Sequence, residues 1–541
     1  MITRYERRWL TACSVALLAL FALPALWGWL APPERWQFYR GWVFAADYTQ
    51  YRSAMAQGYD GAWLIINRFT PESHTPILQY PLYVALGHIA RWLHLPLEIP
   101  YIATSGVAIF VLAFAIYMCA ATFLPDIGDR KLAFLLVFSA GPAWLISVLQ
   151  ALIPALEIFD RYKTAISRTE FNTFLTFAAP PHLPLALAIL LVVLITVYRQ
   201  WQTKTRFPLW QFILSYILPT LLLGLLNPFS LPTLLLPLGL FWLARSIQAR
   251  RLRWQEVPPL VAMGLAALPL VVYNFLTFTQ DPFWGKAYGT QNTQPSYPLD
   301  VVLVSYGVLG LLAIVGTVRL WRTRVSTRVL FFWSLIVILM GYIPVPYQRR
   351  FSLGIAPGLA LLAVAGWRWV AQTKFIHFVQ RHMITRVIGS VILILVLWGQ
   401  NLMFYTAYVL SHLGMGSAPY IVFQPNALAG AATYLDAQGE PVVVLTCEET
   451  GNLLAGGIHG RVVLGHAGAT LNVIARRETV ADFFANALST EAQTRFLAKH
   501  NVSHILTTAI TPLECGSAYT PPAGWTRVFS QEGVVIYEQT P

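Results

Sequence analysis

The sequence has 541 residues, of which 56% are hydrophobic and only 11% charged, whereas soluble domains are usually about 25% charged. This composition excludes a disordered chain and a conventional soluble enzyme. The formal net charge of +13 does not indicate a nucleic-acid partner, because the basic residues gather in short clusters between apolar runs, as in the cytoplasmic loops of membrane proteins. The sequence therefore predicts a polytopic membrane protein.

Apolar segments long enough to span a bilayer recur along the first 410 residues. The first follows a basic N-terminus and is long for a signal peptide, so we expect a retained signal anchor. We expect about 11 transmembrane helices, over residues 9–30, 99–124, 132–156, 177–198, 209–226, 229–244, 257–278, 299–318, 329–346, 351–367 and 387–410.

Residues 78–95 are ambiguous, because this apolar stretch is short and carries His88, Arg91 and His94. If it does not cross the membrane and the N-terminus is cytoplasmic, every basic cluster falls on the cytoplasmic side. We therefore expect a re-entrant or surface-lying helix there, within a large first outer loop at 31–98. The same topology predicts a transmembrane domain over 1–410 in the cell membrane and an extracytoplasmic domain over 411–541.

The composition changes after residue 411, where helical and strand patterns alternate as in a small α/β domain. We expect helices at 427–435, 478–488 and 490–500, strands at 442–445, 461–465 and 502–507, and a hairpin at 525–538. Gly451-Asn452 and Gly465-His466 fit strand-to-helix turns, from which His466 could reach a site on the first outer loop. Cys447 and Cys515 could pair if this region is extracytoplasmic.

The predicted spans contain no Asp, Glu, Lys or Arg in their apolar cores, which argues against an ion-coupled transporter. Acidic residues gather instead in the outer loops. This distribution favours an enzyme that acts on a lipid-borne substrate at the membrane surface.

The first outer loop carries Phe-Ala-Ala-Asp47-Tyr48-Thr-Gln-Tyr51 and, further on, Tyr80-Pro-Leu-Tyr83. A first span, a long outer loop with an acid near its start, and this second motif resemble the GT-C superfamily, which includes protein O-mannosyltransferases, lipid A aminoarabinose transferases and the bacterial oligosaccharyltransferase. The resemblance implies an α-helical polytopic fold with a C-terminal α/β domain. It also implies sugar transfer from a polyprenyl-phosphate or diphosphate carrier outside the cytoplasm. Several relatives have two adjacent acids here, whereas Asp47 is followed by Tyr48.

The resemblance places Asp47 as the general base that takes the proton of an acceptor hydroxyl, with inversion at the anomeric carbon. The alternative is an Asp that accepts backbone hydrogen bonds at a helix start. Arg349 and Arg350, in a Pro-rich turn between two spans, suit the donor phosphate. They would otherwise be interfacial arginines that reach toward lipid headgroups.

Other residues could hold the carrier or the sugar, although each is also a plausible structural residue. They are Tyr48, Tyr51, Arg68, Glu72, His74 and His182, with Asp160, Arg161, Lys163 and Arg168 as weaker candidates. Asp47, Glu72 and His74 could jointly bind a divalent cation, although their spacing matches no dedicated metal motif.

Two further functional classes remain open at this stage. One is a lipid or polysaccharide transporter or flippase without ion coupling, and the other is a scaffold of envelope assembly. The sequence leaves the donor sugar open, and the acceptor as a glycan, a lipid or a protein.

Overall fold

The computed structural model describes residues 2–39, 45–141, 143–153, 161–162, 168–205, 207–322, 325–373, 383–414, 422–439, 441–508, 511–515 and 519–540. Asp160 and Lys163, two of the weaker candidates, lie outside these residues. The chain divides into two compact units. Unit 1 comprises Met1–Phe21, Ser105–Val272 and Gln294–Val409, and unit 2 comprises Ala22–Thr104, Tyr273–Thr293 and Leu410–Pro541.

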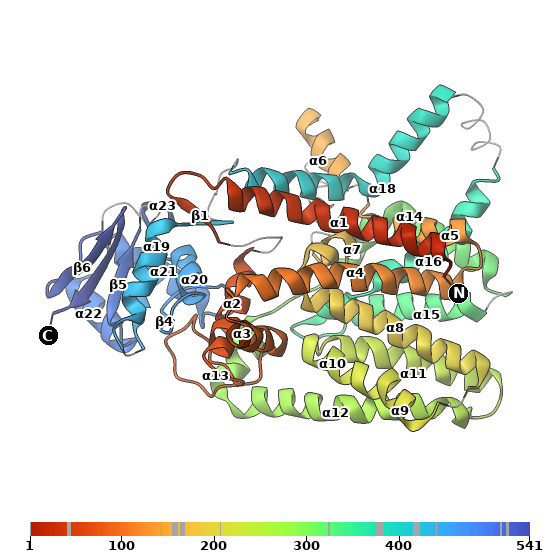
Figure 1. Ribbon diagram of the computed structural model, residues 1–541, viewed down its shortest axis with the longest axis horizontal. Coiled ribbons are helices and arrows are strands. Elements are labelled where there is room, and N and C mark those ends of the chain that lie inside the picture. Colours follow the sequence, from red (N-terminus) through yellow and green to blue (C-terminus); the bar gives the residue numbers. More distant parts are fainter. Residues whose placement is uncertain are drawn as a thin grey trace. The chain divides into compact units, whose positions relative to one another are not determined.

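Unit 1 is helical (Figure 1). Four long helices contribute to both units: α1 (Arg4–Leu30), α4 (Glu98–Phe123), α12 (Val257–Gln280) and α18 (Met383–His412). The others are α5 (Ile127–Leu136), α6 (Ala143–Leu152), α7 (Thr173–Ala178), α8 (His182–Thr203), α9 (Leu209–Phe212), α10 (Leu218–Leu226), α11 (Ser230–Gln248), α14 (Leu299–Leu320), α15 (Val325–Met340) and α16 (Ile355–Val370). Among the described residues, nine helical segments are long and apolar enough to cross a membrane. The predicted polytopic membrane fold is confirmed.

Small residues allow close packing of α14 against α16. A Cβ atom on Gly316 would lie 2.0 Å from the Leu362 carbonyl oxygen, and one on Gly366 would lie 2.0 Å from the Leu312 carbonyl oxygen. Each helix thus places a glycine against the backbone of the other. Such contacts between small residues are a common way for membrane helices to associate, because lipid supplies no hydrophobic driving force between them.

Two predicted spans differ in the structure. The segment 132–156 forms two short helices, α5 and α6, instead of one span. Gly141, between them, has a φ of +72°, and a Cβ there would lie 1.9 Å from the Ser305 carbonyl oxygen. The helix expected over 329–346 ends at Met340, because the prolines at 344 and 346 cannot continue it.

In unit 2, residues 31–98, which we predict to be the first outer loop and name accordingly, contain α2 (Ala45–Tyr59) and α3 (Pro81–Leu93), which also meet at glycines. A Cβ on Gly58 would lie 2.3 Å from the Val84 carbonyl oxygen, and one on Gly87 would lie 2.0 Å from that of Met55. The helix predicted within 78–95 is therefore present. With 13 residues, α3 is shorter than the ~20 residues that a span needs, while its position at the membrane surface stays a prediction.

The C-terminal segment forms the predicted α/β domain around a five-stranded sheet of order β4-β3-β5-β7-β6 (Figure 1). The strands are β3 (Val443–Leu445), β4 (Arg461–Val462), β5 (His504–Thr507), β6 (Trp525–Gln531) and β7 (Val534–Gln539). β3 pairs in parallel with β4 and β5, whereas β7 is antiparallel to β5 and β6. The helices are α19 (Asn426–Asp436), α20 (Glu448–Ala455), α21 (Val473–Phe484), α22 (Thr490–Lys499) and α23 (Thr511–Cys515).

One predicted turn of this domain is wrong. Gly451 and Asn452 lie inside α20 and not in a strand-to-helix turn. The glycine serves the packing of the helix, because a Cβ at this position would lie 1.9 Å from the Leu464 carbonyl oxygen. Gly465-His466 does lie between β4 and α21, as expected.

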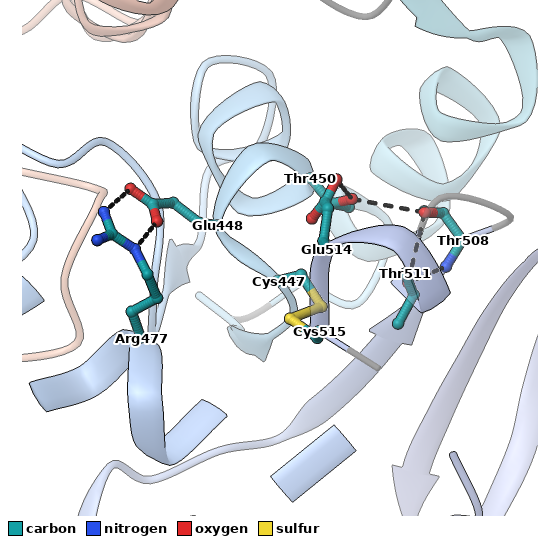
Figure 2. Close-up of a disulfide and its surroundings, with 8 residues drawn as sticks. All are labelled: Cys447, Glu448, Thr450, Arg477, Thr508, Thr511, Glu514 and Cys515. Atoms are coloured by element: carbon teal, nitrogen blue, oxygen red, sulfur yellow. Dashed lines mark hydrogen bonds and ion pairs between the residues drawn. A yellow bond between two sulfur atoms is a disulfide. The ribbon is translucent and has the colours of Figure 1, made fainter. Parts of the chain in front are cut away.

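A disulfide and a strand pair connect distant parts of unit 2. Cys447, just before α20, forms a disulfide with Cys515 at the end of α23 (Figure 2). In addition, β1 (Trp36–Phe38) of the first outer loop pairs antiparallel with β2 (Phe423–Pro425). Unit 2 thus joins the first outer loop to the C-terminal segment. The boundary between the transmembrane domain and the C-terminal domain at residue 410 stays a prediction.

Candidate functional site

Asp47 lies in the first turn of α2, where a carboxylate complements the positive end of the helix dipole. Its side chain is 45% exposed, and its Oδ1 lies 3.0 Å from the Nε2 atom of His466. His466 follows β4 in the C-terminal segment and is largely buried. The contact therefore joins an accessible carboxylate of the first outer loop to an imidazole from a region more than 400 positions away in the sequence.

The backbone defines which imidazole nitrogen carries the proton. The amide N–H of Gly468 lies 3.0 Å from His466 Nδ1 and can only donate, so Nδ1 accepts. In a neutral imidazole the proton then resides on Nε2, which donates to Asp47 Oδ1. A neutral imidazole consequently donates a hydrogen bond to the Asp47 carboxylate and orients one of its oxygens.

Gln50 and Tyr80 extend this cluster. The Gln50 Nε2 atom lies 2.9 and 3.0 Å from the two ring nitrogens of His466, and Tyr80 Oη donates to Gln50 Oε1 at 3.0 Å. The sequence analysis did not identify Gln50. Its position three residues after Asp47, on the same helix face, was the available signal.

Helix α20 packs on α2 through polar contacts. Thr49 Oγ1 donates to Asn452 Oδ1 at 2.6 Å, and Arg52 Nη1 donates to the Gly456 carbonyl oxygen at 2.6 Å. The turn after His466 is held in the same way, because the Asn67 side chain donates to the Ala469 carbonyl oxygen at 2.7 Å. These contacts fix the His466 imidazole against the start of α2.

Glu72 and His74 have different surroundings. The Arg476 guanidinium forms an ion pair with Glu72, and Arg476 is only 5% exposed. Burial raises the pKa of Glu72, but the hydrogen bond and charge of Arg476 outweigh burial, so the pKa is lowered overall. His74 Nε2 accepts from the Asn67 backbone N–H at 2.8 Å, while Nδ1 lies 2.8 Å from the Glu72 carbonyl oxygen. Burial lowers the pKa of His74, and its ring stacks on Phe283.

The cation site expected from Asp47, Glu72 and His74 does not fit this arrangement. Both nitrogens of His74 are used by backbone groups, and the Glu72 carboxylate is paired with Arg476. Within the described ranges, no three His, Cys, Asp or Glu side chains come together in a way that could hold a metal ion. We derive no step through a metal.

The aromatic residues Tyr48 and Tyr51 are core residues of unit 2. Tyr48 packs edge-on against Tyr39 and Tyr101, and Tyr51 stacks on Tyr83 with ring centroids 4.2 Å apart. Their exposed fractions are 2% and 7%. Neighbouring rings cover both side chains, and their expected contact with sugar stays a prediction.

Arg68 is buried beside the Asp47 cluster. Its Nη2 lies 3.7 Å from Asp60 Oδ2, and burial lowers the pKa of the guanidinium. Arg68, Gln50 and Tyr80 all line a small cleft of about 10 Å³, which is room for about one water molecule. Arg68 Nε is buried and has no hydrogen-bond partner among the described residues.

Unit 1 contains Arg349 and Arg350, in the short 3₁₀ turn Gln348–Ser352. Arg349 Nε lies 3.6 Å from Glu170 Oε1, and its backbone N–H donates to the Gln294 carbonyl oxygen at 3.1 Å. Arg350 lies over the Phe229 ring at 5.2 Å from its centroid. Arg349 therefore has a carboxylate partner, whereas the described contact of Arg350 is with an aromatic face.

The remaining candidates of unit 1 are less informative. Arg161 forms an ion pair with Asp300, and Arg168 is exposed. His182 is the first residue of α8. Their proposed contacts with sugar or phosphate stay predictions, as do the catalytic roles of Asp47, Arg349 and Arg350.

Comparison with known proteins identifies the fold. No protein-family model matches the chain, and no curated protein matches it significantly. Among solved structures, the oligosaccharyltransferase of Archaeoglobus fulgidus superposes with a TM-score of 0.50 at 12% identity, covering 92% of this chain and 70% of that one. The mycobacterial arabinofuranosyltransferase AftD gives a TM-score of 0.50 at 12% identity, covering 99% of this chain but only 40% of that one.

A third similar structure is ArnT from Cupriavidus metallidurans, with 11% identity, coverage of 98% of both chains and a TM-score of 0.41. These neighbours are GT-C glycosyltransferases. The archaeal oligosaccharyltransferase and AftD, both at a TM-score of 0.50, confirm the GT-C-like fold expected from the sequence, with about one residue in eight identical.

Proposed function

We propose that this chain is an integral-membrane glycosyltransferase that moves a sugar from a polyprenyl-phosphate or diphosphate carrier to an acceptor hydroxyl on the outer face of the membrane. The hydrogen bond between His466 and the accessible Asp47 carboxylate carries this proposal. The fold supports it, because two solved structures that share it are named as an oligosaccharyltransferase and an arabinofuranosyltransferase.

In the proposed reaction, Asp47 takes the proton of the acceptor hydroxyl while the hydroxyl oxygen attacks the anomeric carbon of the donor sugar. The new bond forms between that oxygen and the anomeric carbon. The bond from the anomeric carbon to the phosphate oxygen breaks, and the lipid phosphate leaves with the electron pair. Direct attack inverts the configuration at the anomeric carbon.

The tautomer of His466 favours Asp47 over His466 as the base. If His466 were the base, its Nδ1 lone pair would have to accept the proton while Asp47 held Nε2–H, as in an Asp-His pair of a hydrolase. That lone pair already accepts the Gly468 N–H. His466 is therefore proposed as a positioning residue that orients the Asp47 carboxylate.

Arg350 and Arg349 are proposed to offset charge on the departing lipid phosphate, since a guanidinium makes strong charge-assisted contacts with phosphate. Arg349 is already paired with Glu170, so part of its charge is used within the protein. Arg350 is the stronger candidate because its described contact, the Phe229 face, leaves the N–H groups at the ring edge available.

The donor can be identified by mass spectrometry of lipid-linked sugars that co-purify with the chain in nanodiscs. The purified chain should then transfer that sugar to an acceptor. Arg350→Gln should lower donor use by an amount equivalent to about 1.5–3 kcal/mol, and Arg349→Gln should lower it less.

An Arg322→Gln variant, in a cluster predicted to be cytoplasmic, is the matched control and should retain full transfer. Movement of the intact lipid-linked sugar across the bilayer without transfer would instead identify a flippase. Wild-type kinetics in both Arg349→Gln and Arg350→Gln would remove these residues from the donor site.

A further inference from the structure

One cavity lined by described residues of unit 2 has a volume of about 230 Å³, somewhat below the roughly 300–1,000 Å³ of sites for drug-sized ligands, so it suits a small ligand. It lies between α2, α19 and the end of α20. Polar groups of several kinds line it: Tyr39, Arg52, Gln424, Thr433 and Asp436. Nothing in the proposed transfer step uses this cavity.

We propose that this cavity binds a neutral sugar unit of a glycan acceptor, at a position separate from the unit that receives the transferred sugar. That the bound sugar belongs to the acceptor rests on the proposed function. That the cavity binds carbohydrate does not depend on it. It specifies the acceptor as a glycan and not as a protein or a lipid.

The charges of the cavity favour a neutral polyol. Arg52 and Asp436 contribute one positive and one negative group, and the side chains of both are 24% exposed. A phosphate group would meet the Asp436 carboxylate, and a cationic ligand would meet the Arg52 guanidinium. Sugar hydroxyls both donate and accept hydrogen bonds, so they can use both groups.

Both charged groups are held in place before any ligand binds. Arg52 Nε lies 3.3 Å from Glu98 Oε1, and Arg52 Nη1 donates to the Gly456 carbonyl oxygen. Asp436 Oδ1 accepts from the His459 backbone N–H at 2.7 Å, and Oδ2 lies 3.1 Å from His459 Nδ1. Prearranged groups lower the entropic cost of binding.

The rest of the lining is apolar, namely Leu428, Ala429, Ala432, Leu453, Leu454 and Gly457. A sugar ring has C–H faces as well as hydroxyl edges. A cavity lined by both apolar and hydrogen-bonding groups can match both, whereas a wholly polar cavity would match only the edges.

The cavity is connected to the proposed site of transfer through shared helices. Arg52 follows Asp47 by five residues on α2, a rise of about 7.5 Å along the helix. Leu453 and Leu454 follow Asn452, which contacts the first turns of α2. A glycan bound in the cavity would therefore be held at a fixed place relative to the Asp47 carboxylate.

The test uses saturation-transfer NMR on the full chain in nanodiscs, with short neutral gluco-, manno-, galacto- and arabino-oligosaccharides as probes. At least one of these should bind. Ala432→Trp should weaken its binding by about tenfold or more, because the indole fills the cavity. Ala437→Trp places the same side chain at an exposed position just after α19 and outside the lining, and this variant should bind the sugar like the wild type.

Asp47→Asn separates this inference from the proposed function, because that variant should lose transfer and still bind the oligosaccharide. If no neutral oligosaccharide binds the wild type, or if Ala432→Trp binds as well as Ala437→Trp, the inference is wrong even if transfer depends on Asp47. Displacement of a bound sugar by inorganic phosphate or by a short peptide at equal concentration would also overturn it.

Discussion

Two carboxylates of the first outer loop, Asp47 and Glu72, have opposite surroundings although both are contacted from the C-terminal segment. Glu72 pairs with the buried Arg476, whose cation balances its charge and occupies its oxygens. Asp47 instead receives a neutral hydrogen bond from His466 and remains 45% exposed. The same segment thus locks one carboxylate into the fold and orients the other toward solvent.

Under the proposed function, the different partners explain why the two carboxylates have different roles. An ion pair with a buried arginine stabilises the charged form and leaves little capacity to accept a proton. A hydrogen bond from a neutral imidazole fixes the geometry without neutralising the charge. We therefore propose a structural role for Glu72 and a chemical role for Asp47.

The largest change in stability is expected for Glu72→Gln. It leaves Arg476 as an unpaired buried charge, which should lower the free energy of unfolding by about 3 kcal/mol. Transfer per folded molecule should be unchanged. Denaturant unfolding and a transfer assay on the same preparation measure the two effects.

The matched control for that variant is Glu448→Gln. Glu448 also pairs with an arginine, Arg477, but this arginine is 51% exposed (Figure 2). Its loss should cost less than about 1 kcal/mol. Equal destabilisation by the two variants, or loss of transfer in Glu72→Gln that stability does not explain, would contradict the structural role of Glu72.

A smaller effect, on transfer, is expected at His466. His466→Ala removes the group that orients Asp47 and should lower kcat by about ten- to a hundredfold with little change in KM. His466→Gln should recover part of the loss, because the Gln Nε2 amide can donate from nearly the same place as the imidazole Nε2.

His500→Gln, a substitution of another buried histidine of the C-terminal segment, should leave transfer unchanged. If His466→Gln were as inactive as His466→Ala and shifted the pH profile of transfer, the imidazole itself would be the base. That result would reverse the roles of the two residues.

A third carboxyl group, Glu514, has no cationic partner among its described contacts. It illustrates a third case, a buried carboxyl group that keeps its proton near neutral pH. It lies beside Thr450 and the disulfide (Figure 2), and burial raises its pKa to about 7. The folded state therefore binds the proton more tightly than the unfolded state does. Its contribution to stability is present at low pH and is lost as the pH rises through about 7.

Between about pH 6 and pH 8, this group alone should lower the free energy of unfolding by about 1 kcal/mol. Glu514→Gln should remove that decrease, whereas Glu491→Gln, at an exposed position of α22, should not. Thermal unfolding of the wild type and both variants across this pH range measures the decrease in stability. The same pH dependence in wild type and Glu514→Gln would show that Glu514 titrates normally in the folded protein.

The sequence predicts the fold well where apolar length and alternation are decisive. Most of the membrane helices and the helices and strands of the C-terminal domain were expected near their observed positions. The sequence does not predict the break at Gly141, because this break depends on the backbone of Ser305, which is distant in sequence. The position of Gly451 inside α20 likewise depends on its contact with Leu464.

For the candidate site, the sequence and the resemblance predict a catalytic role for Asp47, but they do not predict which neighbours distinguish it from Glu72. Those neighbours, His466 and Arg476, come from positions about 400 residues later, so no local pattern links them to the loop. The burial of Tyr48 and Tyr51 was equally hidden, because interfacial and core tyrosines look alike in sequence. Only packing separates them.

The most direct test of the account is transfer by Asp47→Asn from the co-purified lipid-linked donor, measured at equal amounts of folded protein. The Asn side chain keeps the size of Asp and can still contact His466, but it cannot take the acceptor proton. General-base assistance is typically worth 10²–10⁴-fold, so transfer should fall by about that factor, and the wild-type product should have the inverted anomeric configuration. Undiminished transfer by Asp47→Asn, or a wild-type product that retains the donor configuration, would contradict the account.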